Sequence, residues 1–526
     1  MERKGLHLLA GAWRAGGLTG FWALLLLAVG LRFFHLTTKN LWFDEAWSWY
    51  ESQKAIVPII EESAADIHPP LYHLLLRFWT MAFGQSHLAL RMPSLVANVV
   101  TLVLAFFIAR KVMSERIALL TLFFLTISPH QVFYAQEARM YALVTAFSLG
   151  ATFFYLRLIE DWRFRRGDCI GYVLCTTLAL YTHNFAWLVA GAVMLHFLVS
   201  LRERVRMEQP IGPLLRRWIT LHLVILLLFS PWIGPFLFQV GTRPRQGWRR
   251  PLTMAGVFLE DLLFFGKMIV GYFIFPHQVG EALRDLLRDP WSGRRLGSAL
   301  RVLSLYPVAV ISSLILLVRG TTMAASNRII PILFWVPLGA VTGLLLVVKQ
   351  GSDLGRYLLL ISPFFFMLLA AGIDRVRSLY VRVFVIMAIS LAMLSGLMRH
   401  YQVRSHDSDY RPVASIIRAE ARAGDRILVD PVYMGRCLRY YLREAPPGTA
   451  LLEHPSLSPL IQKRLAVPGA ERIWLALDYR SSLFRARTDQ IVLSRAPWKV
   501  IRDERLPEKS PRVRLILLER SDLSRL

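Results

Sequence analysis

Long apolar runs with almost no charge recur along most of this 526-residue chain, and they limit what it can fold into. Runs such as FWALLLLAVGLRFF, WITLHLVILLLFSPWIGPFLF and VFVIMAISLAMLSGLM lack the polar face of a helix that borders water. About 20 apolar residues cross the hydrocarbon of a bilayer, and helices are the open-chain structures that satisfy the backbone there. Since 55% of the residues are hydrophobic, we expect a polytopic, all-α membrane protein.

Eleven apolar segments are predicted to be transmembrane helices, near residues 18–36, 88–109, 117–134, 140–158, 169–183, 185–201, 218–238, 302–318, 329–348, 357–373 and 380–398. The first run has no small-residue cleavage site, so it is interpreted as a retained helix rather than a signal peptide. Residues 252–276 include Glu260, Asp261 and Lys267. We expect a re-entrant or interfacial pair of helices there, although two further spans would raise the number to thirteen.

Basic residues indicate the orientation, because cytoplasmic loops of membrane proteins carry the excess of Lys and Arg. They gather at the N-terminus and in alternate turns, which read ARKVMSER, EDWRFRRGD, RERVRMEQPIGPLLRRW, VRGTTMAASNR and DRVRSLYVR. The pattern places the N-terminus in the cytoplasm and the loops 37–87 and 239–300 outside the cytoplasmic (inner) membrane. It also accounts for the net charge of +26, so nucleic-acid binding is not expected.

The composition changes near residue 402. The stretch DYRPVASIIRAEARAGDRILVDPVYMGRCLRYYLR is typical of a helix, a Gly-containing turn, a buried strand and a second helix. ERIWLALDY, WKVIRDERL and VRLILLER are further predicted strands. We therefore divide the chain into a membrane domain, residues 1–401, and a soluble, extracytoplasmic α/β domain, residues 402–526, which has an ordinary domain size.

The first outer loop carries two acids, Asp44 and Glu45, within the aromatic stretch LWFDEAWSWY. One interpretation is a solvated charge pair whose aromatic neighbours anchor the loop at the membrane interface. The other is catalytic, because a carboxylate half-desolvated at a membrane boundary has a raised pKa and suits a proton acceptor near neutral pH. Spacing alone leaves both interpretations open.

The same loop contains a predicted helix in HPPLYHLLLRFWTMAFG. Pro70 suits a first helical turn, where its missing N–H has no consequence. One face of this helix would be apolar, as in a helix that lies in the membrane interface, and would consist of Leu71, Leu74, Leu75 and Phe78.

A second outward acid follows the third predicted span. Ser128 and Pro129 are expected to break that span, and Glu137 and Arg139 to open the next one. As a helix-end charge, Glu137 would stabilise the dipole by roughly 0.3–1 kcal/mol. Alternatively, the acid and the cation belong to a site, because ionisable groups at membrane depth are often functional.

Other candidates lie near the outer ends of predicted helices. Arg356 and Tyr357 lie in GSDLGRYLLLISP, where the Arg356 guanidinium could contact lipid headgroups or bind a phosphate bidentately. His68 and His183 are candidates for substrate contact, although histidines at such positions more often have a structural role. The i, i+5 spacing of His68 and His73 does not fit one helix face, and the three cysteines lack metal-ligand spacing, so no metal is expected.

Together, LWFDEAWS, HPPLYHLLLRFW, RMPSLVANV, YAQEARMYAL and GRYLLLISP resemble, in order and spacing, the polyprenyl-phosphate-dependent glycosyltransferases of the GT-C fold. The bacterial branch related to protein O-mannosyltransferases and lipid A aminoarabinose transferases is the most similar. Residues 239–300 match poorly. The predicted outer domain also differs from the corresponding modules of those families, which leaves the acceptor open. A related oligosaccharide-transferring branch uses a divalent ion.

The resemblance implies a transferase for a hexose or pentose, which moves a sugar from a polyprenyl-phosphate donor to a lipid, glycan or protein hydroxyl with inversion. Asp44 would deprotonate the acceptor, with Glu45 as its motif partner. Glu137 and Arg139 match the second outer motif, with Glu137 as a further catalytic acid and Arg139 as a ligand of the donor phosphate. Arg356 would neutralise the leaving phosphate, and Tyr357 would contact the substrate, as would His68 and His183. No cofactor is implied.

Two other functions fit the sequence less well. A transporter or flippase of lipid-linked sugars would place ionisable groups near the bilayer midplane, often in repeated halves, and this chain has acids at one interface and no repeat. A membrane scaffold would not need eleven spans or an acidic, aromatic loop. The glycosyltransferase is therefore the preferred prediction.

Overall fold

The computed structural model describes residues 2–160, 162–242, 311–322, 328–348, 355–403, 409–443, 446, 449–453, 470–478, 498–506 and 513–520. The chain divides into two compact units that alternate along the sequence. The first unit contains Met1–Leu36, Ala55–Gly84 and Arg91–Gln402. The second contains Thr37–Lys54, Gln85–Leu90 and Val403–Leu526. The loop segment around Asp44 therefore belongs to the same unit as the C-terminal residues.

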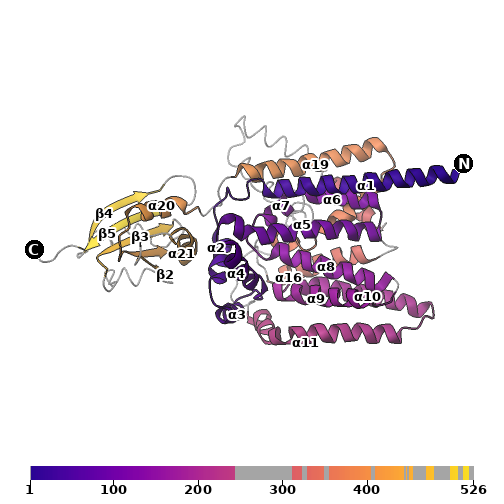
Figure 1. Ribbon diagram of the computed structural model, residues 1–526, viewed down its shortest axis with the longest axis horizontal. Coiled ribbons are helices and arrows are strands. Elements are labelled where there is room, and N and C mark those ends of the chain that lie inside the picture. Colours follow the sequence, from indigo (N-terminus) through magenta and orange to yellow (C-terminus); the bar gives the residue numbers. More distant parts are fainter. Residues whose placement is uncertain are drawn as a thin grey trace, which may run out of the picture. The chain divides into compact units, whose positions relative to one another are not determined.

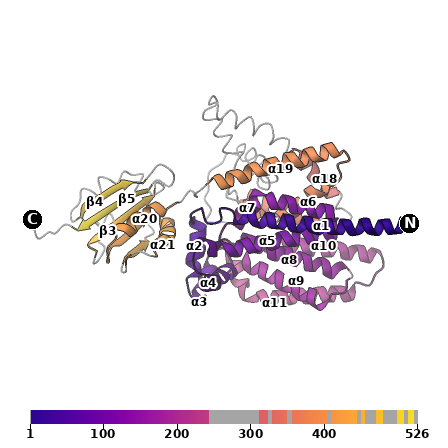
Figure 2. The same ribbon diagram turned by 45° about the horizontal axis from the view of Figure 1, so that its top comes forward.

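The first unit is a bundle of helices that run side by side (Figures 1 and 2). Its helices are α1 (Glu2–Phe33), α3 (Ile56–Ala65), α4 (Leu71–Phe83), most of α5 (His87–Val112), α6 (Glu115–Ile127), α7 (Pro129–Ala135), α8 (Tyr141–Glu160), α9 (Arg166–Thr182), α10 (Ala186–Arg206), α11 (Gly212–Thr242), α16 (Ile329–Val348), α17 (Gly355–Leu358), α18 (Ser362–Asp374), α19 (Leu379–Gln402) and a helix at Ile311–Thr322. α3, α4 and α7 lie at the end of the bundle away from the N-terminus (Figures 1 and 2).

Several helices of this bundle are long and apolar enough to cross a membrane. Each predicted span coincides, at least in part, with a helix among the described residues. Five of the described helices are long and apolar enough to cross a bilayer, and the bent pair α6–α7 can be a sixth. The total of eleven transmembrane spans, or thirteen, stays a prediction. Residues 252–276 lie outside the described ranges.

The break predicted at Ser128 and Pro129 is present. α6 and α7 meet there at a bend of 61°. The Ser128 hydroxyl accepts a hydrogen bond from the Gln131 N–H at 3.4 Å and so caps α7, while Pro129 occupies the first turn of α7. The local sequence therefore turns the chain before it reaches Glu137.

α4 forms where it was predicted, but it begins at Leu71, so Pro70 is the N-cap rather than a residue of the first turn. Its buried residues are Tyr72, His73, Leu76 and Thr80. The predicted apolar face is the more open one, and Phe78 is 55% exposed. An apolar face that the protein does not cover suits a helix in contact with lipid.

A chain of polar side chains crosses the interior of the bundle. Arg32 of α1 is fully buried, and its Nε donates to Asn98 Oδ1 at 2.6 Å. Asn98 Nδ2 donates to Gln131 Oε1 at 2.7 Å, and Gln131 Nε2 donates to Ser362 Oγ at 2.6 Å. Arg32 also donates to the carbonyl oxygens of Leu125 at 3.1 Å and Thr126 at 3.4 Å. These carbonyls lie in the last turn of α6, where carbonyl groups have no partner within the helix. The network therefore supplies hydrogen-bond donors to the end of α6 at the bend.

The second unit contains a mixed sheet of five described strands, in the order β2-β1-β3-β5-β4. The strands are β1 (Arg426–Asp430), β2 (Ala450–Glu453), β3 (Arg472–Asp478), β4 (Trp498–Arg505) and β5 (Val513–Arg520). β1 pairs in parallel with β2 and β3, whereas β5 pairs antiparallel with β3 and β4. β3 is buried throughout. In the edge strand β4, partly buried and exposed residues alternate, because successive side chains point to opposite faces of the sheet.

Three helices complete the described part of this unit: α20 (Arg411–Glu420), α21 (Val432–Tyr441) and α2 (Phe43–Ser52). α2 packs against α21. Ala46 of α2 is fully buried in one hydrophobic cluster with Val413, Ile417, Met434 and Cys437. The segment from the first outer loop thus contributes directly to the core formed by the C-terminal residues.

Candidate functional site

The link between α7 and α8, residues 136–140, carries Glu137 and Arg139. Glu137 is 2% exposed and Arg139 is 6% exposed. The two residues precede α8, which begins at Tyr141, so the expectation that they form its first turn is wrong. The Arg139 N–H donates to the Glu137 carbonyl at 2.8 Å, and the Arg139 carbonyl accepts from Ser94 Oγ at 3.0 Å. Both side chains are thus buried on a tight, anchored link rather than at a solvated helix end.

Tyr141 lies beside two cationic candidates, Arg139 and Arg356. Its hydroxyl accepts a hydrogen bond from Arg356 Nη1 at 3.3 Å. The guanidinium carbons of Arg356 and Arg139 lie 5.8 and 5.7 Å from the centre of its ring. Two cations that are far apart in sequence therefore converge on one phenol. Such an arrangement can hold an anion with several oxygen atoms, because guanidinium groups bind phosphate strongly.

Aromatic candidates surround the same tyrosine. The ring centres of His183 and Tyr357 lie 5.8 and 6.1 Å from that of Tyr141, and 5.5 Å from each other. His68 joins the group, 5.0 Å from His183. The structure therefore brings together five of the predicted site residues: Arg139, Arg356, His68, His183 and Tyr357.

His183 lies in the loop between α9 and α10, outside both helices. Its Nδ1 accepts a hydrogen bond from the Phe185 N–H at 3.0 Å, so in the neutral ring the proton is on Nε2. Burial, together with the positive charges of Arg139 and Arg356, lowers the pKa of His183 to about 3. The imidazole is therefore neutral at physiological pH and leaves the positive charge to the two arginines.

The loops that carry His68 and His183 are joined by amide hydrogen bonds. Asn184 Nδ2 donates to the Ile67 carbonyl and to Gln239 Oε1, both at 3.0 Å. Gln239 Nε2 donates to the Ser63 carbonyl at 2.8 Å. This connection between α11 and the loop before α4 keeps the two histidine loops together.

Asp44 and Glu45 lie in the first turn of α2, in the second unit. Glu45 is fully buried, whereas Asp44 is partly exposed. The aromatic neighbours contact the C-terminal segment: the Arg436 guanidinium lies 3.8 Å from the ring centre of Tyr50 and 4.8 Å from that of Trp47. These aromatic side chains therefore attach α2 to α21.

Tyr141 is the residue that sequence reasoning did not select. It lies in the quoted motif YAQEARMYAL, two positions after Arg139, but it resembles an ordinary apolar position at the start of a helix. Its role is visible only when Arg356, 215 residues away in sequence, is placed beside it. Within the described ranges, no group of three His, Cys, Asp or Glu residues could hold a metal ion.

The fold matches solved structures along nearly the whole chain. ArnT from Cupriavidus metallidurans in the apo state is 12% identical, with a TM-score of 0.57 over 97% of this chain and 98% of that one. The same protein bound to undecaprenyl phosphate gives the same identity and TM-score over 95% and 98% of the two chains. The Archaeoglobus fulgidus oligosaccharyltransferase in complex with Zn and sulfate is 11% identical, with a TM-score of 0.53 over 89% of this chain and 69% of that one.

Residues 67–234 match the family described as dolichyl-phosphate-mannose-protein mannosyltransferase. No curated protein sequence matches the chain significantly. The predicted resemblance to the GT-C class is confirmed, and at these identities the structural likeness establishes the fold. The chain is a multi-pass membrane protein with this fold.

Proposed function

We propose that this protein is a membrane glycosyltransferase that moves a sugar from a polyprenyl-phosphate donor to an acceptor hydroxyl on the outer face of the cytoplasmic membrane. The observation that carries the proposal is the convergence of Arg139 and Arg356 on Tyr141. Support comes from proteins of the same fold whose structures hold undecaprenyl phosphate or dolichol-phosphate. The orientation rests on the distribution of basic turns.

In this proposal, Arg356 and Arg139 bind the phosphate of the donor. The Tyr141 hydroxyl, which accepts from Arg356, fixes the direction of that guanidinium. Glu137, two positions before Arg139 on the same buried link, is a further proposed catalytic acid. His68, His183 and Tyr357 form the aromatic wall beside the cations, and they contact the substrate.

Asp44 is the proposed base. It takes the proton from the acceptor hydroxyl as the acceptor oxygen attacks the anomeric carbon. The bond between that carbon and the phosphate oxygen breaks, and the electron pair leaves with the phosphate. Because the guanidinium groups stabilise the charge on the leaving group, one base is sufficient and no paired general acid is required. A single displacement of this kind inverts the anomeric centre.

The phosphate assignment is tested with undecaprenyl phosphate and the purified full-length protein in nanodiscs. Arg356→Gln and Arg139→Gln should each weaken binding roughly tenfold to a hundredfold, the usual effect of losing a charged hydrogen bond. Arg375→Gln is the matched control, because Arg375 is an exposed arginine at the end of α18. If the original protein and the three variants bound undecaprenyl phosphate equally well, the proposed phosphate site would be excluded.

The base is tested in a deletion strain that expresses each variant at matched levels, with mass spectrometry of envelope lipids and glycans. Asp44→Asn should bind undecaprenyl phosphate as the original protein does, yet form no product. Normal product from Asp44→Asn would exclude Asp44 as the base. If that variant also moved labelled lipid-linked sugar across vesicles, the transporter alternative would be favoured.

A further inference from the structure

The segment that carries Asp44 is built into the C-terminal unit. Residues 37–54 and 85–90 cluster with Val403–Leu526, although more than 300 residues separate them in sequence. Ala46 has no exposed surface and packs in the same cluster as Val413 and Cys437. Because Ala46 lies in the same helical turn as Asp44 and Glu45 on a ten-residue helix, this packing sets the position of the whole helix.

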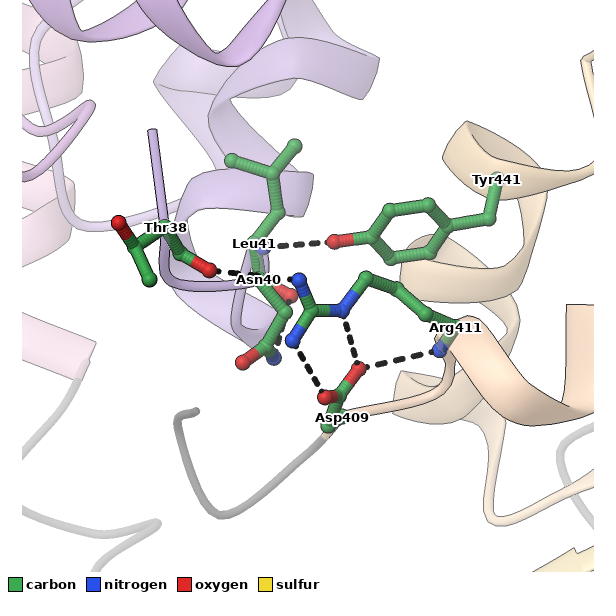
Figure 3. A network of polar contacts seen from close by, with 6 residues as sticks. All are labelled: Thr38, Asn40, Leu41, Asp409, Arg411 and Tyr441. Carbon is green, nitrogen blue, oxygen red and sulfur yellow. Dashed lines mark hydrogen bonds and ion pairs between the residues drawn. The ribbon is translucent and has the colours of Figure 1, made fainter. Parts of the chain in front are cut away.

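Polar contacts hold the entry to that helix (Figure 3). The Leu41 N–H donates to the Tyr441 hydroxyl at 2.7 Å. Arg411 Nη1 donates to the Thr38 carbonyl at 3.3 Å. Asp409 fixes the Arg411 guanidinium through two hydrogen bonds of 2.8 and 2.6 Å. The backbone that enters α2 is therefore held at two points by side chains from the C-terminal segment.

The far end of α2 has its own attachment. The Tyr440 hydroxyl donates to the Gln85 carbonyl at 2.8 Å. Gln85 Oε1 accepts from Trp49 Nε1 at 2.9 Å, and Gln85 Nε2 donates to Gln53 Oε1 at 2.8 Å. Tyr441 thus holds the backbone that enters α2, and its neighbour Tyr440 holds the far end of α2 through Gln85.

We propose that the C-terminal unit is the positioning platform of the catalytic carboxylate, and that Tyr441 is the positioning residue that sets the direction of Asp44. The inference rests on the proposed role of Asp44 as base. The Leu41 N–H lies three residues before Asp44, so loss of its acceptor frees the turn that precedes the carboxylate. A misplacement of about 1 Å is enough to reduce a reaction rate a hundredfold.

The chemistry of Tyr441 suits this task. Burial raises the pKa of Tyr441, so its hydroxyl keeps its proton across the neutral range. The neutral oxygen accepts from Leu41 without adding a negative charge beside the buried Glu45. Phenylalanine at this position would keep the ring and its packing while removing the acceptor.

The test compares Tyr441→Phe with Tyr410→Phe in the full-length protein. Tyr410 is fully buried, and its hydroxyl donates to Asp478 Oδ2 of β3 at 2.7 Å, so it controls for the loss of a buried tyrosine hydroxyl whose hydrogen bond goes to the sheet rather than to the backbone before α2. Product in the deletion strain and affinity for undecaprenyl phosphate are both measured, at matched protein levels.

Tyr441→Phe should lower product formation roughly tenfold to a hundredfold while affinity for undecaprenyl phosphate is unchanged, and Tyr410→Phe should leave both near their original values. Equal product from the two variants would overturn the platform. A parallel fall in affinity would also overturn it, because the effect would not be specific to the carboxylate. Asp44→Asn separates the two proposals: if it retains product, the base assignment fails, whereas its inactivity with an active Tyr441→Phe rejects only the platform.

Discussion

Arg32 offers a stability test whose size follows from the structure. Its guanidinium is fully buried and makes three hydrogen bonds outside its own helix, to Asn98 Oδ1, the Leu125 carbonyl and the Thr126 carbonyl. Side-chain hydrogen bonds in membrane proteins contribute about 0.6 kcal/mol on average and up to about 1.7 kcal/mol each. Arg32→Met, which keeps an unbranched apolar stem, should therefore lower the free energy of unfolding by roughly 2–5 kcal/mol.

The measurement is SDS-induced unfolding of the purified protein in detergent micelles, with Arg375→Met as an exposed control that should change stability by less than about 0.5 kcal/mol. A double-mutant cycle with Asn98→Leu isolates the pair. Because the two side chains share one hydrogen bond, the double variant should lose at least about 0.5 kcal/mol less than the sum of the single variants. Additive losses, or a stable Arg32→Met protein, would refute the argument that this arginine supports the broken helix.

Two further predictions concern single positions. The pKa of His183 is lowered to about 3 in the folded protein, compared with about 6.5 in the unfolded protein. Between these pH values the unfolded protein binds more protons than the folded protein, so the free energy of unfolding falls as the pH is lowered from about 6.5 toward 3. His183→Gln should thus flatten the fall in stability between pH 7.5 and 5, by about 2 kcal/mol at pH 5, and an unchanged slope would contradict the cause given for the shift. A Cβ at Gly372 would lie 1.9 Å from the Leu316 carbonyl oxygen, so Gly372→Ala should destabilise the bundle by about 1–3 kcal/mol or more in the same unfolding assay. Gly339→Ala, with nothing within 4 Å, should be neutral or slightly stabilising, and equal effects of the two substitutions would show that the helices separate at Gly372 without cost.

Features with a local cause could be predicted from the sequence. Apolar runs identified the helices because burial in lipid requires uninterrupted apolar residues. Ser128 and Pro129 marked the bend because one caps a helix and the other starts one. The cationic residues Arg139 and Arg356 were selected as charges near predicted helix ends, and the structure brings them to the same tyrosine.

Features that depend on distant partners could not be predicted. Tyr141 has no periodicity or charge to distinguish it until Arg356 is placed beside it. Arg32 was expected to be part of an ordinary span, since nothing nearby in sequence reveals Asn98 as its partner. The contact of Leu41 with Tyr441 joins residues 400 positions apart, and neither residue carries a motif for it. For the same reason, the sequence did not reveal that residues 37–54 belong to the second unit.

The alternation of the two units along the chain has a consequence for biosynthesis. At about 5–20 residues per second, a ribosome needs roughly 20–80 s to travel from Leu41 to Tyr441. During that interval α2 has been made, but the residues that cover its apolar side have not. The nascent segment therefore stays uncovered until about 400 further residues have been made, and a chain that stops before α20 leaves its proposed catalytic carboxylate without a support.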